Sequence, residues 1–255
     1  TGKINNNIRA GSYNLATASN LSAKGFPAID YLLYYPLASS EIIVLYTTDE
    51  HSEKRKQYLN TIIAEITSLA VNAHTQWLPS GGNYVATFST SLGNDVGSSI
   101  GMLVNQLNYD YELIKTNKLA IPMGKKSLGT LYPEKIEGYY CTKSMDLIKE
   151  HLTAVERIYL GTTSTDENKF GLDDNLIHLD AKHNDTTLDA AIKDQFAVIK
   201  KAVSVVPNPL STAITNNSPE LNTAYIEIQK MVVLLKTDLP SALGVLITYQ
   251  DNDGD

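Results

Sequence analysis

Apolar residues recur three or four positions apart along most of the chain, which is the period of an α-helix with one buried face. The first long stripe lies in residues 49–77 and contains Leu59, Ile62, Ile63, Ile66, Leu69, Ala70, Ala73 and Trp77. We expect a long amphipathic helix there. A capping box of Thr47 and Glu50 is expected to begin it, and Pro79 is expected to end it.

Four further stripes predict helices in the rest of the chain. The second contains Leu92, Val96, Ile100, Leu103, Leu107, Tyr111 and Ile114. The third contains Ile148, Leu152, Val155 and Tyr159, ended by Gly161, and the fourth contains Leu188, Ile192, Phe196, Ile199 and Val203. The fifth contains Leu221, Tyr225, Ile228, Val232, Leu235 and Leu239. Ser218 and Pro219 suit its start, and Pro240 is expected to end or kink it.

These helices, joined by polar connections with no clear strand alternation, predict an all-α fold. We expect one domain over residues 1–255, built from two packed helical bundles. The first would span residues 1–118 and the second residues 144–255, with residues 119–143 as a long connection of a functional kind.

Three glycines, Gly93, Gly97 and Gly101, recur every fourth residue and would share one face of the second helix. Glycine in a helix costs about 1 kcal/mol relative to alanine, so a helix that keeps three of them is expected to pack closely against a neighbour. We therefore predict that Gly97 lies at a close helix crossing, in preference to a ligand lying on the glycine face.

Composition narrows the possible functions. The chain has 43% hydrophobic and 19% charged residues, and no apolar run approaches the roughly 20 residues of a membrane-spanning helix, so we expect no transmembrane span. A net charge of −7 with scattered lysines argues against nucleic acid as a partner. Cys141, the single cysteine, is expected to be a small buried hydrophobe rather than a nucleophile.

The stretch SAKGFPAIDYLLYY, residues 22–35, has the features of a helix start. Pro27 suits the first helical position, and Asp30 lies close enough to the positive end of the helix to be favoured there. We expect the Asp30 carboxylate to accept hydrogen bonds from backbone N–H groups or to pair with Lys24 or Lys118.

Within this stretch, KGFPAIDYLLY resembles the signature segment of the imelysin-like proteins (peptidase M75-like), iron-regulated proteins of the cell envelope once classed as metallopeptidases. Their motif reads Gly-x-His-x-x-Glu at a helix start. Gly25 matches it, whereas Pro27 stands in place of the histidine and Asp30 in place of the glutamate. The resemblance therefore implies a motif that has lost one proposed metal ligand and shortened the other.

Three more segments, YELIKTNKLAIPMG, YPEKIEGYYCTKSMDLIKEHLTAVERIYLG and YQDNDGD, resemble the branch of that family described as predicted periplasmic lipoproteins. This branch usually carries a Gly-x-Pro-Ala-x-carboxylate variant of the motif. The resemblance covers nearly the whole chain and implies a periplasmic or outer-membrane-anchored lipoprotein. It also implies a helical segment before residue 1 that this chain lacks.

Charged residues around the long connection form a second candidate site. Glu112, Lys115 and Lys118 share a helical face, while Glu134 and Glu137 follow in the connection. A solvated charged face is the default interpretation of such residues. The resemblance raises the alternative that they line a cleft between the bundles, together with Lys24 and Asp30.

Other candidate metal ligands are weaker. His178, Asp180, His183 and Asp185 lie within eight residues, but a solvated loop is the favoured interpretation because no second cluster supports them. Asp251, Asp253 and Asp255 are expected to form a solvated terminus. His74 and His151 lie on or beside apolar stripes and are expected to be hydrogen-bonded residues at the edge of the core.

Together these observations predict a non-catalytic binding protein of the cell envelope, linked to iron or haem uptake by the resemblance alone. Its partner would be a small ligand or an envelope protein; we expect no cofactor, with iron or another metal left open. A metal-dependent peptidase is the first alternative and would need Asp30, acidic cleft residues and the cluster from His178 to Asp185. A protein-interaction scaffold is the second.

Overall fold

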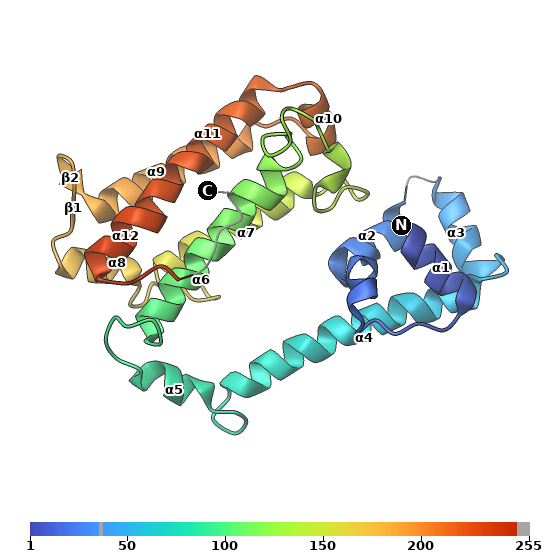
Figure 1. Ribbon diagram of the computed structural model, residues 1–255, viewed down its shortest axis with the longest axis horizontal. Helices are drawn as coiled ribbons and strands as arrows, with labels where there is room; N and C mark the ends of the chain where they lie inside the picture. The colour runs from blue at the N-terminus through green and yellow to red at the C-terminus, as the bar shows by residue number, and fades with distance from the viewer. Residues whose placement is uncertain (36–37, 249–255) are drawn as a thin grey trace. The chain divides into compact units, whose positions relative to one another are not determined.

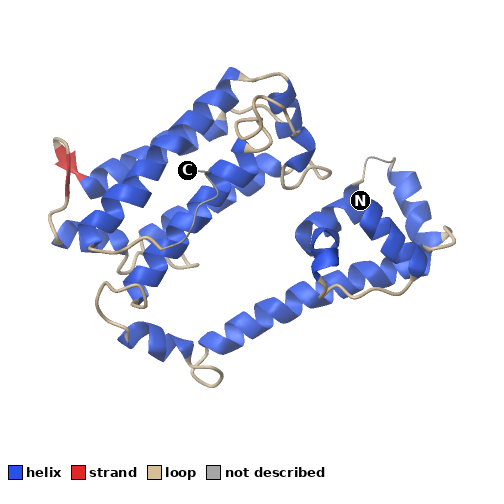
Figure 2. Ribbon diagram, viewed as in Figure 1, coloured by secondary structure: helices blue, strands red, loops and turns tan. Residues whose placement is uncertain are grey.

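The computed structural model describes residues 1–35 and 38–248, and its regular secondary structure is almost all helix (Figures 1 and 2). The described strands are β1 (Lys182–His183) and β2 (Thr186–Thr187), which pair antiparallel with Lys182 opposite Thr187. The all-α prediction is confirmed. The predicted solvated terminus at Asp251, Asp253 and Asp255 lies outside the described residues.

The chain divides into two compact units. Unit 1 comprises residues 1–86 and 138–141, and unit 2 comprises residues 87–137 and the chain from residue 142 onward. The boundary between the two bundles is predicted from the sequence at residues 119–143, whereas the two units divide near residue 86. The reason is that α6 (Ser99–Leu113), which precedes residue 119, packs against α7 (Ser144–Tyr159) and α11 (Pro219–Val233) of unit 2. Tyr111 of α6 donates a hydrogen bond to the carbonyl oxygen of Ile228 at 2.7 Å.

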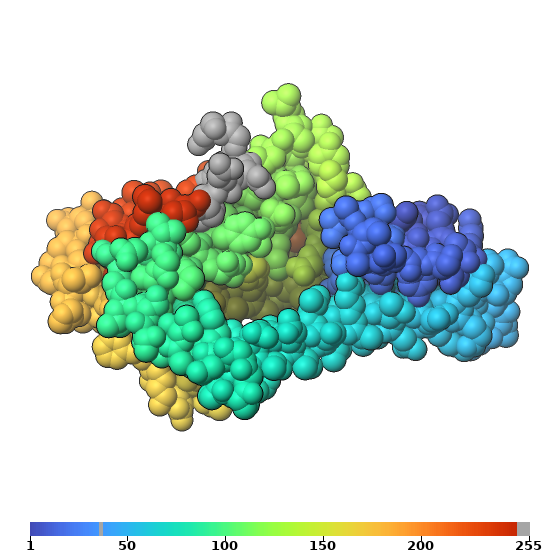
Figure 3. All heavy atoms as spheres, turned by 60° about the horizontal axis from the view of Figure 1, so that its bottom comes forward, coloured from blue at the N-terminus to red at the C-terminus, as the bar shows by residue number. Residues whose placement is uncertain are grey.

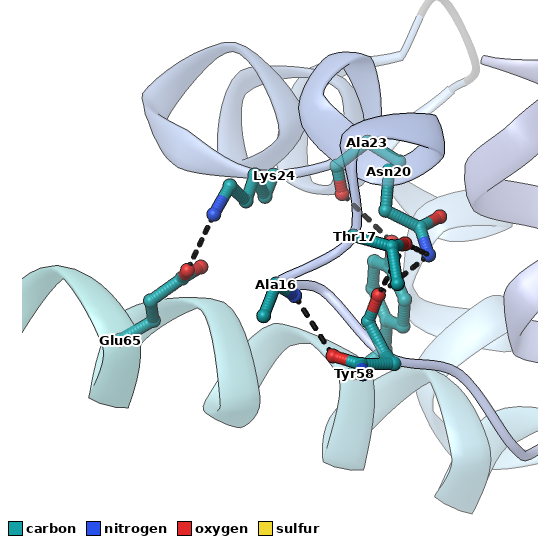
Figure 4. A network of polar contacts seen from close by, with 8 residues as sticks. Ala16, Thr17, Asn20, Ala23, Lys24, Tyr58 and Glu65 are labelled. Atoms are coloured by element: carbon teal, nitrogen blue, oxygen red, sulfur yellow. Dashed lines mark hydrogen bonds and ion pairs between the residues drawn. The ribbon is translucent and has the colours of Figure 1, made fainter.

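Unit 1 is built on the first half of α4 (Ser52–Trp77). The other elements of this unit are α1 (Gly2–Ala10), η1 (Ala18–Ala23), α2 (Gly25–Tyr34) and α3 (Ser39–Thr47). The fully buried Tyr58 donates to the carbonyl oxygen of Ala23 at 2.7 Å (Figure 4) and accepts from Asn7 at 3.1 Å. Its hydroxyl is thus satisfied inside an apolar core, as buried polar groups generally are.

The long helix predicted over residues 49–77 is confirmed, but its apolar stripe is only partly buried. Ile62 is buried and Ile66 half-buried, whereas Leu69 and Trp77 are exposed. The dark blue residues near the N-terminus cover only part of the cyan helix α4 (Figure 3). The predicted capping box is wrong because Thr47 belongs to α3. The side chain of Asp49 instead accepts a hydrogen bond from the backbone N–H of His51 at 2.8 Å.

Unit 2 contains the helices whose stripes were most regular. Its elements are α5 (Tyr84–Thr90), which spans the division, α6, η2 (Ile114–Ala120), η3 (Pro133–Lys135), α7, α8 (Leu172–His178), α9 (Leu188–Ser204), α10 (Leu210–Thr215), α11, η4 (Leu234–Asp238) and α12 (Leu239–Leu243). All predicted stripe residues of α7 and α9 are buried. Gly161 ends α7 with a φ of +62°, and the Ser218 hydroxyl caps α11 by accepting from Leu221 N–H at 3.3 Å, as expected.

Two helices of unit 2 continue into π-helical turns, η2 after α6 and η4 after α11. Such widened turns are rare and are frequently found at functional sites. Pro240, which was expected to end or kink the helix, lies in the first turn of α12, directly after η4, so the helical run does not end at this proline. Proline has no backbone N–H, and this is tolerated in the first turn of α12 because the α-helical hydrogen-bond pattern has already changed in η4.

The prediction of a glycine face is wrong. The helix begins at Ser99, so Gly93 and Gly97 precede it, and Leu92 is 83% exposed. A Cβ atom on Gly97 would meet open space, whereas one on Gly101 would overlap the carbonyl oxygen of Asp95. The glycine that close packing requires is therefore Gly101, at the point where Ser98 caps α6.

Within residues 1–35 and 38–248, no single helix has both the length and the apolar character needed to cross a membrane. By length and composition alone, residues 18–34 and α3 together are long and apolar enough for a membrane span, but the two segments are bent by 111° relative to each other.

Candidate functional site

Asp30 is half-buried in the second turn of α2, where both of its carboxylate oxygens accept backbone hydrogen bonds. The N–H of Tyr140 donates to Oδ2 at 3.0 Å, and the N–H of Cys141 donates to Oδ1 at 2.8 Å. A charged acceptor makes these bonds stronger than those between neutral groups. Asp30 thus fixes residues 138–141 onto α2, which confirms the predicted backbone partners.

The chain reaches Asp30 through two residues with left-handed backbone conformations. Gly138 has a φ of +65° and Thr142 a φ of +59°, so sharp turns flank the two donating N–H groups. Between them the half-buried Cys141 directs its Sγ toward the carbonyl oxygen of Gly138 at 3.6 Å. Cys141 is therefore positioned by its backbone rather than packed as the fully buried hydrophobe that we expected.

Two tyrosines of the bonded segment, Tyr139 and Tyr140, cluster with two tyrosines of α2 and its C-terminal end, Tyr31 and Tyr35. The ring of Tyr140 lies 5.5 Å from that of Tyr31, 5.7 Å from that of Tyr35 and 5.0 Å from that of Tyr139, measured between centroids. Such tilted and edge-to-face pairs are favourable arrangements of aromatic rings. Burial, followed by the nearby tyrosines and Asp30, raises the pKa of Tyr140 above its usual value, so its phenol stays protonated.

The remaining motif residues shape the helix start. Gly25 begins α2 with a φ of +75°, a conformation that favours glycine. Pro27 is exposed in the first turn, as its third residue rather than its first. Lys24 extends to Glu65 of α4, with 2.6 Å between Nζ and Oε1 (Figure 4). The predicted pairing of Asp30 with Lys24 is therefore wrong.

A second polar cluster lies in unit 2, at the junction of α6 and η2. Nζ of Lys115 is 2.7 Å from Oε2 of Glu112, and the two side chains are only 8% and 10% exposed. The other oxygen of Glu112, Oε1, has no hydrogen-bond partner among the described residues, and Nζ of Lys236 in η4 lies 4.0 Å from it. A buried carboxylate with one unsatisfied oxygen is an unusual feature that costs stability.

Lys118 and Glu137 form the next ion pair of this cluster, at 2.6 Å, which also excludes Lys118 as the partner of Asp30. His151 lies nearby and is half-buried, which agrees with the predicted position at the edge of the core, whereas the predicted hydrogen bond of its ring stays a prediction. Burial and the Lys118 cation lower the pKa of His151, against weaker opposing effects of Asp110 and Glu137. The imidazole is therefore neutral at neutral pH.

The predicted cleft residues thus form two groups. Lys24 and Asp30 belong to unit 1, whereas Glu112, Lys115, Lys118 and Glu137 belong to unit 2. Glu134 lies exposed in η3. A common cleft remains a prediction.

The weaker metal candidates are dispersed. His178 and Asp185 are exposed, Asp180 pairs with Lys182 at 2.6 Å, and Nδ1 of His183 is 3.1 Å from Oδ2 of Asp238. His74 is exposed on α4 and so is not a residue of the core edge as predicted. Among the described residues, no three His, Cys, Asp or Glu side chains are grouped as a metal site would require.

Sequence reasoning missed the partners that define both clusters. Glu65 lies 41 positions from Lys24, Tyr140 lies 110 positions from Asp30, and Lys236 lies 124 positions from Glu112. No local sequence pattern identifies partners at such separations. The pair of Glu112 and Lys115 could be predicted from the sequence, because an i, i+3 spacing brings two side chains together on a helix.

Comparison with known proteins identifies a family and a similar fold. Residues 2–235 match the family model described as imelysin. The fold is similar to a crystal structure assigned as an iron-regulated protein A precursor from Parabacteroides distasonis, with a TM-score of 0.70 and 14% sequence identity over 95% of this chain and 72% of that one. A search of curated proteins finds no match.

Proposed function

Because the chain belongs to the imelysin family, we propose that it is a non-catalytic binding protein of the cell envelope that serves iron or haem uptake. A periplasmic or outer-membrane-anchored location is part of this proposal and rests on the resemblance to the lipoprotein branch. The iron link is supported by the structural relative, which is described as iron-regulated.

The observation that carries the non-catalytic assignment is the environment of Asp30. The motif of the family places a histidine and a glutamate at the positions of Pro27 and Asp30. Pro27 has no lone pair for a metal, and each oxygen of Asp30 already accepts a backbone N–H. A catalytic zinc site commonly has three protein ligands and a water molecule, and these two motif positions provide at most one ligand, which already has a structural role.

Metal content and ligand binding test this proposal on the purified protein. We expect saturable binding of haemin, followed by its absorbance, or of ferric iron, followed by elemental analysis after dialysis. We expect no hydrolysis of a casein substrate with added Zn²⁺. Absence of both haemin and iron binding would overturn the uptake role and leave the scaffold hypothesis.

The Asp30→Ala variant tests the peptidase alternative directly. Metal-dependent proteolysis by the unmodified protein that disappears in Asp30→Ala would show that the motif is a working metal site. A Lys24→Gln variant is the matched control, because it changes a neighbouring charge that contacts Glu65 rather than residues 138–141.

A further inference from the structure

Unit 1 contains a cavity of about 290 Å³ that involves none of the motif residues. Residues of α1, α2, α3 and the start of α4 line it. Its volume is near the lower end of the range of pockets that hold small organic molecules, about 300 Å³. The cavity is therefore large enough for a compact ligand.

One wall of the cavity is apolar. Ile8, Leu32 and Leu45 contribute aliphatic side chains, and Tyr31 and Tyr35 contribute rings whose centroids lie 5.0 Å apart. A planar or aliphatic body would bury its surface against these residues. Phenol hydroxyls add polar groups at the edge of this wall, and that of Tyr31 already accepts a hydrogen bond from Asn5 at 2.8 Å.

Arg55 provides the charged group of the cavity. Its side chain is half-buried, and its Nε is a buried donor with no acceptor among the described residues. The guanidinium carbon lies 6.0 Å from the ring centroid of Tyr46, a contact that gives Nε no hydrogen-bond acceptor. Buried donors are normally paired, so an orphaned guanidinium N–H indicates an acceptor that the chain does not supply.

The acidic residues at the cavity do not neutralise Arg55. Asp49 accepts the backbone N–H of His51, and Glu50 is a largely exposed side chain 3.6 Å from the imidazole of His51. Neither carboxylate forms a described ion pair with Arg55, and Arg9 adds a second cation to the lining. The lining thus carries two cations and two carboxylates, and the feature that favours an anionic ligand is the unpaired Nε of Arg55 rather than a net charge.

We propose that this cavity binds a small organic carboxylate. The carboxylate would accept two hydrogen bonds from the guanidinium of Arg55, in the bidentate geometry that arginine offers to planar anions. The apolar body of the ligand would contact Leu32, Tyr31 and Tyr35. This site is separate from Asp30 and is independent of the proposed role in iron uptake.

Benzoate is a suitable probe, because it combines a carboxylate with a planar apolar body, and benzamide is its neutral counterpart. We expect saturable binding of benzoate in NMR titrations, with shifts confined to the cavity residues. Benzamide should bind at least about tenfold more weakly, since the charge-assisted pair contributes most of the affinity. Equal binding of both compounds, or no saturable binding of benzoate, would overturn the proposal.

Variants of the cavity residues test whether Arg55 binds the carboxylate of benzoate. Arg55→Gln should weaken benzoate binding by about tenfold or more, whereas Lys56→Gln, which changes the next residue of the same helix, should leave it within about twofold. Lys56 pairs with Glu53 and does not line the cavity. If Arg55→Gln does not fold, Leu45→Trp, which fills the cavity, should abolish binding instead. Retained affinity in a folded Arg55→Gln or Leu45→Trp protein would show that benzoate binds elsewhere.

Discussion

Oδ1 of Asp30 accepts a hydrogen bond from the backbone N–H of Cys141 at 2.8 Å, although 111 positions separate the two residues in the sequence. Together with the bond from Tyr140, this contact places a four-residue segment of the long connection within unit 1. Asp30 therefore has a structural role at the position where the family motif has a proposed metal ligand.

Asp30→Asn should destabilise unit 1 by about 1 to 3 kcal/mol, because an amide can accept at only one of its two terminal atoms and loses the charge that strengthens both bonds. Hydrogen exchange at the amides of Tyr140 and Cys141 measures this locally, and both should exchange faster. Asp185→Asn, an exposed change in unit 2, is the control and should leave these amides protected. Unchanged exchange in Asp30→Asn would contradict the structural role.

Lys115→Met should cost about 3 to 5 kcal/mol of unfolding free energy, because it leaves the carboxylate of Glu112 charged and buried. The double variant with Glu112→Leu should recover much of this loss, since an apolar pair of similar size replaces both charges. Urea denaturation measures the effect. As a control, Asp146→Asn removes the exposed pair with Lys143 and should change stability by less than about 1 kcal/mol. A double variant no more stable than Lys115→Met would argue against this account.

The lowered pKa of His151 makes the stability of unit 2 depend on pH. The unfolded chain binds a proton at the ordinary pKa of 6.5, whereas the folded protein binds it only at lower pH. The contribution of the neutral His151 imidazole to the stability of unit 2 is therefore fully present above pH 6.5, and it is lost as the pH falls through the pKa of His151 in the folded protein. His151→Gln should reduce the loss of stability on acidification below pH 6.5, as measured by denaturation at several pH values.

The same histidine reports on the ion pair beside it. Lys118→Met should raise the pKa of His151, because it removes the nearby cation and leaves Glu137 without this partner. An NMR titration of the imidazole resonances measures the shift. Lys149→Met, on the same helix, is the control and should move the pKa less. An unchanged or lower pKa of His151 in Lys118→Met would show that the Lys118 cation does not contribute to the low value.

Gly101→Ala should destabilise unit 2 by roughly 1 to 3 kcal/mol, because the new Cβ would overlap the carbonyl oxygen of Asp95 and force the start of α6 to move. Gly97→Ala is the matched control and should be neutral, since its Cβ meets open space. Thermal unfolding of both variants distinguishes them. Equal melting temperatures would indicate that the Ser98 turn relaxes without cost.

Helix positions could be predicted where periodicity and capping agree. In α9, Ile192, Phe196 and Ile199 follow a helical period and are fully buried, and in α11 Ser218 provides the expected cap. In the Gly93 to Gly101 stretch, a four-residue spacing looked helical although two of the glycines precede the helix. A shared spacing does not establish a helix without a capping residue, and the cap here is Ser98.

The candidate site was harder to predict, because its contacts join distant parts of the chain. The sequence identified Asp30 and the type of its partners, but not the segment that supplies them. The π-helical turns η2 and η4 were also missed, since an i to i+5 hydrogen-bond pattern leaves no distinct periodicity in five to seven residues.

The assignment of residues 138–141 to unit 1 affects the order in which the protein can fold during synthesis. When residue 86 has just emerged from the ribosome, the helices of unit 1 are free to fold, but the N–H groups that donate to Asp30 have not yet emerged. Unit 1 would therefore remain incomplete until more than fifty further residues, including all of α6, have emerged. A nascent chain halted before Tyr139 should leave Asp30 accessible to solvent, and release of the next few residues should cover it.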